Sequence, residues 1–140
     1  MKRILIVANR TLCGEHLLDE VRREMAEGEC EFHVVVPASH PGAGTWTEGG
    51  AQASARQRLD EMLPVLESLG AKATGEVGDP NPVLAVNDAI IANRYDAMIV
   101  STLPPGASSW LHADVVHRLR RRFPNMAITH VIQETSVGVS

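Results

Sequence analysis

The sequence has few cysteines and no long hydrophobic stretch. Its two cysteines among 140 residues are too few for a disulfide framework and are not spaced for zinc. The longest apolar runs are about six residues, far short of the ~20 that cross a bilayer. The apolar run that follows Lys2 is also too short for a signal peptide. We therefore expect a cytoplasmic protein with no membrane partner.

An excess of positive charge is also missing. The formal net charge of −4 offers no general attraction for nucleic acid, so we expect no nucleic-acid partner. The one basic cluster, His117–Phe123, closes a predicted helix, where cations offset the negative end of the helix dipole. Hydrophobic residues make up 44% and charged residues 21%, which is typical of a globular protein, and the length fits one domain.

Strand and helix patterns alternate along the chain. Helical spacing of apolar residues lies between five expected strands, at residues 3–9, 30–37, 71–78, 96–102 and 126–132. The first strand is continuously apolar, which is typical of a strand covered on both faces. This order predicts an α/β fold, a single-domain three-layer α/β/α sandwich with a five-stranded parallel sheet. The domain spans residues 1–132, and a polar tail follows at 133–140.

Local signals add detail to this outline. Residues 37–52 are rich in Gly and Pro and predict a long mobile loop, and Pro64 should kink the helix that follows. The third strand has few large apolar side chains and is expected at a sheet edge. Asp79 and Asn81 can each cap the third helix, and Pro82 suits its first turn. Its expected buried face consists of Val83, Val86, Ile90 and Ile91.

The common chemistries of α/β proteins lack their motifs here. A dinucleotide fingerprint needs three glycines after the first strand, and Gly14 is alone there. No Gly-Lys-Ser/Thr phosphate loop and no Gly-x-Ser-x-Gly elbow exist. Ala8 and Asn9 stand where a phosphoacceptor receiver domain has acidic residues, and Asp19 stands where a cysteine phosphatase needs arginine. The histidines are not spaced for a metal, so we assign no catalytic or metal-binding residue.

A resemblance to a known family appears in the second half of the chain. The segment "VGDPNPVLAVNDAIIANRYDAMIVSTLPPG" and the basic helix and apolar strand after it resemble universal stress proteins over about residues 77–131. The shared features are a Gly-x-Pro helix start at 78–80, an Ala/Ile-rich helix, and "YDAMIV" as the following strand. As architecture the resemblance covers residues 1–132. It implies the strand order 3-2-1-4-5, which places the ends of strands one and four side by side.

The same resemblance implies a test for ATP binding. The nucleotide-binding branch of the family holds ATP with the pattern Gly-x2-Gly-x9-Gly-Ser/Thr, and this chain has Ser101, Pro104, Asp114 and Val115 at those positions. Pro104 removes an N–H donor. Asp114 places a carboxylate near phosphate charge, a repulsion of roughly 4 kcal/mol at ~4 Å and an effective dielectric of about 20. Asn9 or Arg10 replaces the aspartate that contacts adenosine, so we expect this binding mode to be lost.

Hydrogen-bonding groups nevertheless surround the predicted crevice. Arg10 could replace the lost amide donors for a monophosphate or another anion, whereas Ser108 and Ser109 could serve only to cap the last helix. The candidate binding residues are Asn9, Arg10, Thr11, Ser101, Thr102, Gly106, Ser108 and Ser109.

The leading hypothesis is a universal-stress-protein-like binding or regulatory domain in stress response, without a cofactor and not an enzyme. In the family the fifth strand often pairs across a dimer axis, so we expect a homodimer with Thr129 and His130 near the seam. One alternative is a protein or enzyme that takes a nucleotide, ATP or AMP, or a small phosphorylated ligand in the altered crevice. Another is a redox or partner-binding module that uses Cys13 and the loop around Trp46.

Overall fold

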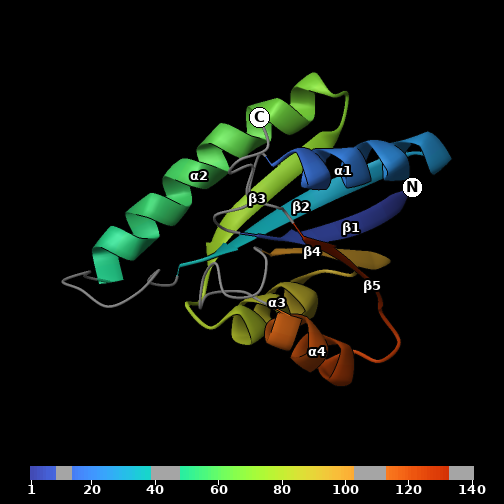
Figure 1. Cartoon of the computed structure of the whole chain (residues 1–140). Helices are drawn as coiled ribbons and strands as arrows, with labels where there is room; N and C mark the ends of the chain where they lie inside the picture. Colours follow the sequence, from blue (N-terminus) through green and yellow to red (C-terminus); the bar gives the residue numbers. More distant parts are fainter. Residues whose placement is uncertain (9–13, 39–47, 103–112, 133–140) are drawn as a thin grey trace, which may run out of the picture.

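The fold follows the predicted order of strands and helices (Figure 1). The structure is a computed structural model, and it describes residues 1–8, 14–38, 48–102 and 113–132. The elements are β1 (Lys2–Val7), α1 (Glu15–Glu27), β2 (Cys30–Pro37), α2 (Glu48–Ser68), β3 (Lys72–Gly78), α3 (Pro82–Ala92), β4 (Ala97–Thr102), α4 (Ala113–Arg122) and β5 (Ala127–Ile132).

The five strands form one parallel sheet in the order β3-β2-β1-β4-β5, which confirms the expected order. In its register, Val7 at the end of β1 lies beside Val35 of β2 on one side and Val100 of β4 on the other. β3 lies at an edge, as its scarcity of large apolar side chains predicted. The chain therefore reverses its winding direction between β1 and β4, where open α/β sheets place their ligands.

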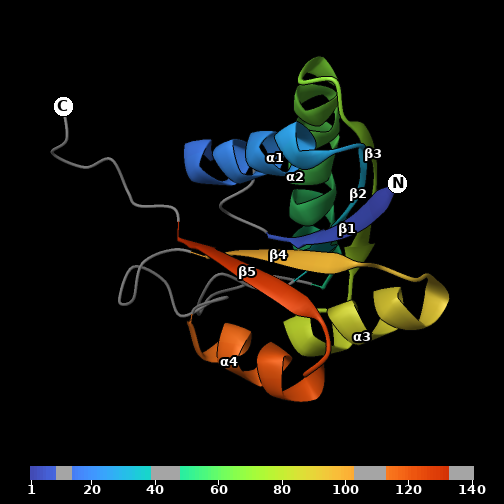
Figure 2. The same cartoon turned by 90° about the vertical axis from the view of Figure 1, so that its right-hand side faces the viewer.

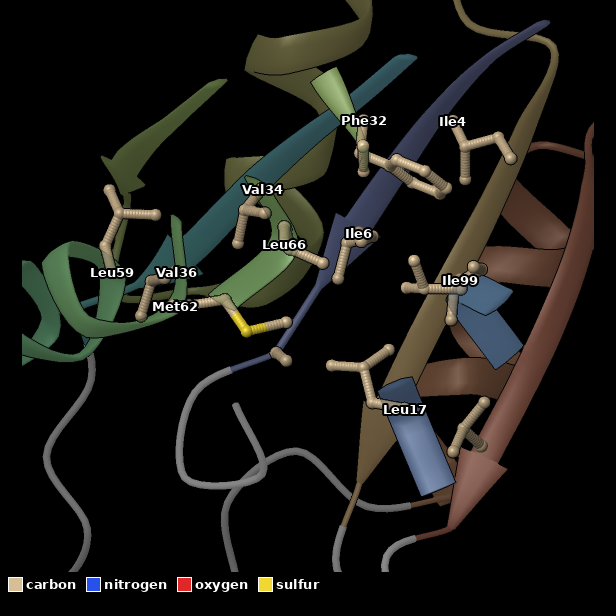
Figure 3. Packing of buried hydrophobic residues seen from close by; sticks show 14 of the residues in the cluster. Ile4, Ile6, Leu17, Phe32, Val34, Val36, Leu59, Met62, Leu66 and Ile99 are labelled. Atoms are coloured by element: carbon tan, nitrogen blue, oxygen red, sulfur yellow. The ribbon is translucent and has the colours of Figure 1, made fainter. Parts of the chain in front are cut away.

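The helices cover both faces of this sheet. Figure 2 shows α1 and α2 on one side of the strands and α3 and α4 on the other. Leu17 of α1 and Leu59, Met62 and Leu66 of α2 pack against alternate residues of the central strands (Figure 3). The buried residues of β1 have no exposed surface and divide between the two core clusters, which confirms that this strand is covered on both faces.

The predicted loop at residues 37–52 was too long, because α2 already begins at Glu48. Gly49 and Gly50 are poor helix formers, but they lie in the first turn of α2. Ala55 is fully buried against the sheet, and this packing outweighs weak local propensity. Pro64 lies inside α2, which continues through it to Ser68 as one helix.

The start of α3 is as predicted, but one residue of its buried face is wrong. The Oδ1 atom of Asn81 accepts the amide of Val83 at 3.0 Å, and Pro82 takes the first helical position. Ile91, expected inside, is 76% exposed, whereas Ala89 is buried. Since each residue turns a helix by about 100°, Ile91 lies about 200° around the axis from Ala89 and faces solvent.

At Gly78, α3 packs close against the edge strand β3. A Cβ atom on Gly78 would lie 2.8 Å from the Cβ of Ala85 and 3.0 Å from a methyl group of Val35. Neither neighbour can move freely, because both are buried in the same core cluster. The absence of a side chain at Gly78 therefore sets the distance between α3 and β3.

We expect Gly78→Ala to lower the free energy of unfolding by about 1–3 kcal/mol, as overpacking does, in denaturant titrations. The matched control repeats the substitution in an Ala85→Gly background, which removes the opposing Cβ at a cost of about 1 kcal/mol of helix propensity. Gly78→Ala should cost clearly less in that background. Equal costs in the two backgrounds would show that the close approach is not the constraint.

Candidate functional site

The predicted crevice corresponds to the carboxyl ends of β1 and β4, which are direct neighbours in the sheet. After β1, the buried Ala8 continues beside β2, and its amide donates to the carbonyl oxygen of Val35 at 3.4 Å. Two of the predicted binding residues, Ser101 and Thr102, lie at the end of β4. The other predicted residues fall outside the described part of the chain, as does Cys13: Asn9, Arg10, Thr11, Gly106, Ser108 and Ser109.

Ser101 and Thr102 are both buried, with 0% and 1% of their surface exposed. Successive side chains of a strand point to opposite faces of the sheet. Ser101 follows the alternation of Ile99, which packs in the cluster under α1 and α2, whereas Thr102 follows Val100, which packs under α3 and α4. The two hydroxyl groups therefore belong to different faces and do not form a joint polar site.

The hydroxyl of Thr102 is bound within the sheet. Its Oγ1 atom lies 2.8 Å from Nε2 of His130, which stands on the neighbouring strand β5. Burial lowers the pKa of His130, and the nearby guanidinium of Arg120 lowers it further. The fold thus favours the neutral imidazole, whose Nε2, when unprotonated, can accept a hydrogen bond from the hydroxyl of Thr102.

Val115 is the third described residue that bears on phosphate binding. It lies in the first part of α4, has 7% of its surface exposed, and packs in the core cluster with Val116 and Leu119. At the position where the nucleotide-binding pattern ends in a serine or threonine, the chain therefore has a buried hydrocarbon side chain. Such a side chain offers no hydrogen bond to a phosphate oxygen.

A polar cluster on β2 and β3 was not predicted from the sequence. Nδ1 of His33 lies 2.7 Å from Oγ1 of Thr74, and its Nε2 lies 2.7 Å from Oε2 of Glu76. The ring of His33 also stacks on Tyr95, with centroids 6.1 Å apart. The available signal was a histidine inside a mostly apolar strand, but its partners become visible only through the register that pairs His33 with Thr74.

The cluster continues onto β1. The guanidinium of Arg3 lies 5.3 Å from the centroid of the Tyr95 ring, and its Nε donates to Glu31 at 3.1 Å. A hydroxyl, an imidazole and a carboxylate in sequence also occur in hydrolases. Here, however, Thr74 lies directly opposite His33 on the edge strand and Glu76 lies diagonally, opposite Val35. Polar cross-strand pairs of this kind stabilise a sheet. We interpret the cluster as structural.

Other chemistries find little support in the described part of the chain. Within it, no group of three or more His, Cys, Asp or Glu side chains is placed to hold a metal ion. Burial raises the pKa of the Cys30 thiol, and the nearby Glu24 adds to the effect, so this cysteine has little thiolate character. None of the described helices combines the length and the apolar character that a membrane crossing requires.

The lowered pKa of His130 predicts a specific pH dependence. In the unfolded chain His130 takes up its proton at about pH 6.5, and in the folded chain it does so at a lower pH. The neutral form of His130 therefore contributes stability above about pH 6.5, and this contribution is lost as the pH falls through the pKa of the folded chain. We expect the free energy of unfolding to fall more steeply between about pH 7.5 and about pH 5 in the unaltered chain than in His130→Gln. Urea titrations at each pH measure both curves. If the two curves run parallel, the lowered pKa of His130 is contradicted.

Comparison with known proteins supports the fold. No family model and no curated protein sequence matches the chain. Among solved structures, it is similar to a universal stress protein family member from Burkholderia pseudomallei, with a TM-score of 0.68, 12% identity, and 92% of this chain and 94% of that chain covered.

Two further structures agree with this result. A universal stress protein from Archaeoglobus fulgidus has a TM-score of 0.64 and 13% identity, covering 94% of this chain and 93% of that one. A universal stress protein family member from Arabidopsis thaliana, with AMP bound, has a TM-score of 0.61 and 8% identity, covering 98% and 95%. The strand order and the helices on both faces agree with this likeness, and the chain has the universal stress protein fold.

Proposed function

We propose that the chain is a binding or regulatory domain of the universal stress protein type, active in stress response, that does not hold ATP in the manner of the nucleotide-binding branch. The observation that supports this proposal most strongly is the burial of Val115. Where that branch offers a hydroxyl to the phosphates, the chain has a hydrocarbon side chain buried in the core under α4. A phosphate oxygen placed there would lose its water without gaining a donor.

The other positions of the pattern support the same conclusion. Ser101, at the first glycine position, is fully buried within the sheet. By sequence alone, Pro104 lacks the amide donor that a phosphate loop needs, and Asp114 adds negative charge. The residues present therefore do not fit a triphosphate, and we assign no step of a reaction to one.

The second candidate function is binding of a nucleoside monophosphate or another small phosphorylated ligand. The neighbour from Arabidopsis thaliana carries AMP, which has a single phosphate group. A monophosphate needs fewer donors than a triphosphate, and Arg10, next to the end of β1, is a cation that could bind it. This candidate differs from the first in that it requires Arg10.

A homodimer through β5 is part of the proposal. β5 is an edge strand, and edges with unpaired backbone groups and apolar side chains tend to pair with another chain. Ile132, at the end of β5, is 41% exposed, and Thr129 and His130 are partly exposed. Pairing of two β5 strands would cover these residues and extend the sheet across the dimer axis.

Thermal unfolding in the presence of ATP, ADP, AMP or a cyclic nucleotide distinguishes the two ligand hypotheses. We expect Mg-ATP to leave the Tm unchanged within about 1 °C, since a ligand at 100 times its Kd raises the Tm of a small domain by several degrees. A clear rise with ATP would contradict the first proposal. A rise with AMP that Arg10→Ala abolishes would favour the second, and Arg118→Gln on α4 is the matched control.

The mass in solution tests the dimer. Light scattering at micromolar concentration should give twice the chain mass of 15.2 kDa. Thr129→Lys on β5 should shift the protein toward the monomer, because it places like charges together at the seam. Leu84→Lys, at an exposed position of α3, should leave the mass unchanged. A monomeric mass for the unaltered chain would overturn this part of the proposal.

A further inference from the structure

A second candidate ligand site lies at the outer end of the sheet. An open groove of about 830 Å³ is found where β3 ends beside α2. β2 and β1 separate β3 from β4, so the groove is distinct from the crevice between β1 and β4. Its volume falls in the range of small-molecule sites. It is lined by Gln52, Ala53 and Arg56 of α2, by Glu76, Val77 and Gly78 of β3, and by Asp79 and Pro80.

The β3 wall of this groove is held by several contacts. The carbonyl of Gly78 accepts the amide of Ala38 at 3.1 Å, which ties the end of β3 to the end of β2. Asp79 accepts the amide of Asn81 at 2.8 Å, and Asn81 in turn caps α3. The turn from β3 into α3 is therefore fixed before any ligand arrives, as is usual in binding sites.

The α2 wall is anchored to the same strand. Leu59 of α2 packs so closely over β3 that a Cβ atom on Gly75 would overlap with it. Ala55 and Leu59 are buried, so they hold this part of α2 against the sheet. Arg56, between them in the chain, contributes to the lining of the groove.

Opposite charges line the two walls. On α2, the guanidinium of Arg56 has only a loose ion pair, with Nε 3.6 Å from Oδ1 of Asp60 and both side chains 61% exposed. On the β3 side, the carboxylate of Asp79 has one oxygen on the amide of Asn81. Glu76 contributes to the lining, but its carboxylate contacts His33 on the α3 side of the sheet, away from α2. A carboxylate can accept further hydrogen bonds at its second oxygen.

We propose that this groove binds a small zwitterion of the α-amino acid class. The ligand carboxylate pairs with the guanidinium of Arg56, which can grip it with two parallel hydrogen bonds. The ligand ammonium lies against Asp79. A polyphosphate would be repelled by Asp79, and a simple cation would gain no interaction with Arg56. A ligand with both charges is the class that complements both walls.

Titration of the full chain followed by two-dimensional amide NMR tests the proposal. Each proteinogenic α-amino acid is added singly up to about 10 mM, a concentration at which a ligand with a millimolar Kd is detected. At least one should shift the amide signals of residues 52–56 and 76–79. Its N-acetyl derivative, which lacks the ammonium, and its amide, which lacks the carboxylate, should bind at least about tenfold more weakly, the loss expected for one charge-assisted hydrogen bond.

Two variants locate the site, and both should fold because they alter exposed side chains. Arg56→Gln and Asp79→Asn should each weaken binding about tenfold or more. Arg118→Gln, on α4 at the opposite face of the sheet, should leave it unchanged. The proposal is overturned if no amino acid shifts these signals, if the N-acetyl or amide derivatives bind equally well, or if Arg56→Gln has no effect.

Discussion

The parallel pairing of β1 with both β2 and β4 fixes where the other elements can lie. From β1 the chain moves outward through β2 to β3, and α1 and α2 cover one face on the way. It then returns across β1 to β4 and continues to β5, so right-handed crossovers place α3 and α4 on the opposite face. This reversal leaves β1 at the centre of the sheet, and the residues from Ile4 to Val7 have no exposed surface.

The position of a strand in this sheet determines the chemistry at its carboxyl end, which differs between the centre of the sheet and its outer edge. At the centre, polar groups that follow buried strands must satisfy their hydrogen bonds inside the protein, as Thr102 does with His130. At the outer edge, β3 is covered less completely, so Glu76 and Asp79 keep contact with solvent. Open α/β sheets place their ligands at the centre of this edge, and here its described residues Ser101, Thr102 and Val115 are buried.

The sequence predicted the parts of the fold that depend on one element at a time. A continuous apolar run identified β1, and Asn81 with Pro82 located the start of α3, because burial on two faces and capping both leave local patterns. The start of α2 and the exposure of Ile91 could not be predicted in the same way, because both depend on which residues meet the sheet. The strand order came from the family resemblance, since periodicity alone left several orders open.

The candidate site was less predictable than the fold, because polar partners lie far apart in the sequence. The contacts of Thr102 with His130 and of His33 with Glu76 join residues on neighbouring strands, and the register of the sheet decides which atoms meet. The sequence of β3, "KATGEVG", has few large apolar side chains and therefore a low strand propensity. Its two glycines allow α2 to pack over Gly75 on one face and α3 over Gly78 on the other.

This close packing explains why an edge strand can form a firm wall for a groove. An edge strand pairs on one side alone, so it depends more than a central strand on what covers its faces. Leu59 of α2 and Ala85 of α3 reach β3 because no Cβ atom separates them from the backbone. The glycines lower the strand propensity of β3 but permit the contacts that hold it in place. The same residues therefore weaken the strand in isolation and fix its end, where the charged walls of the groove meet.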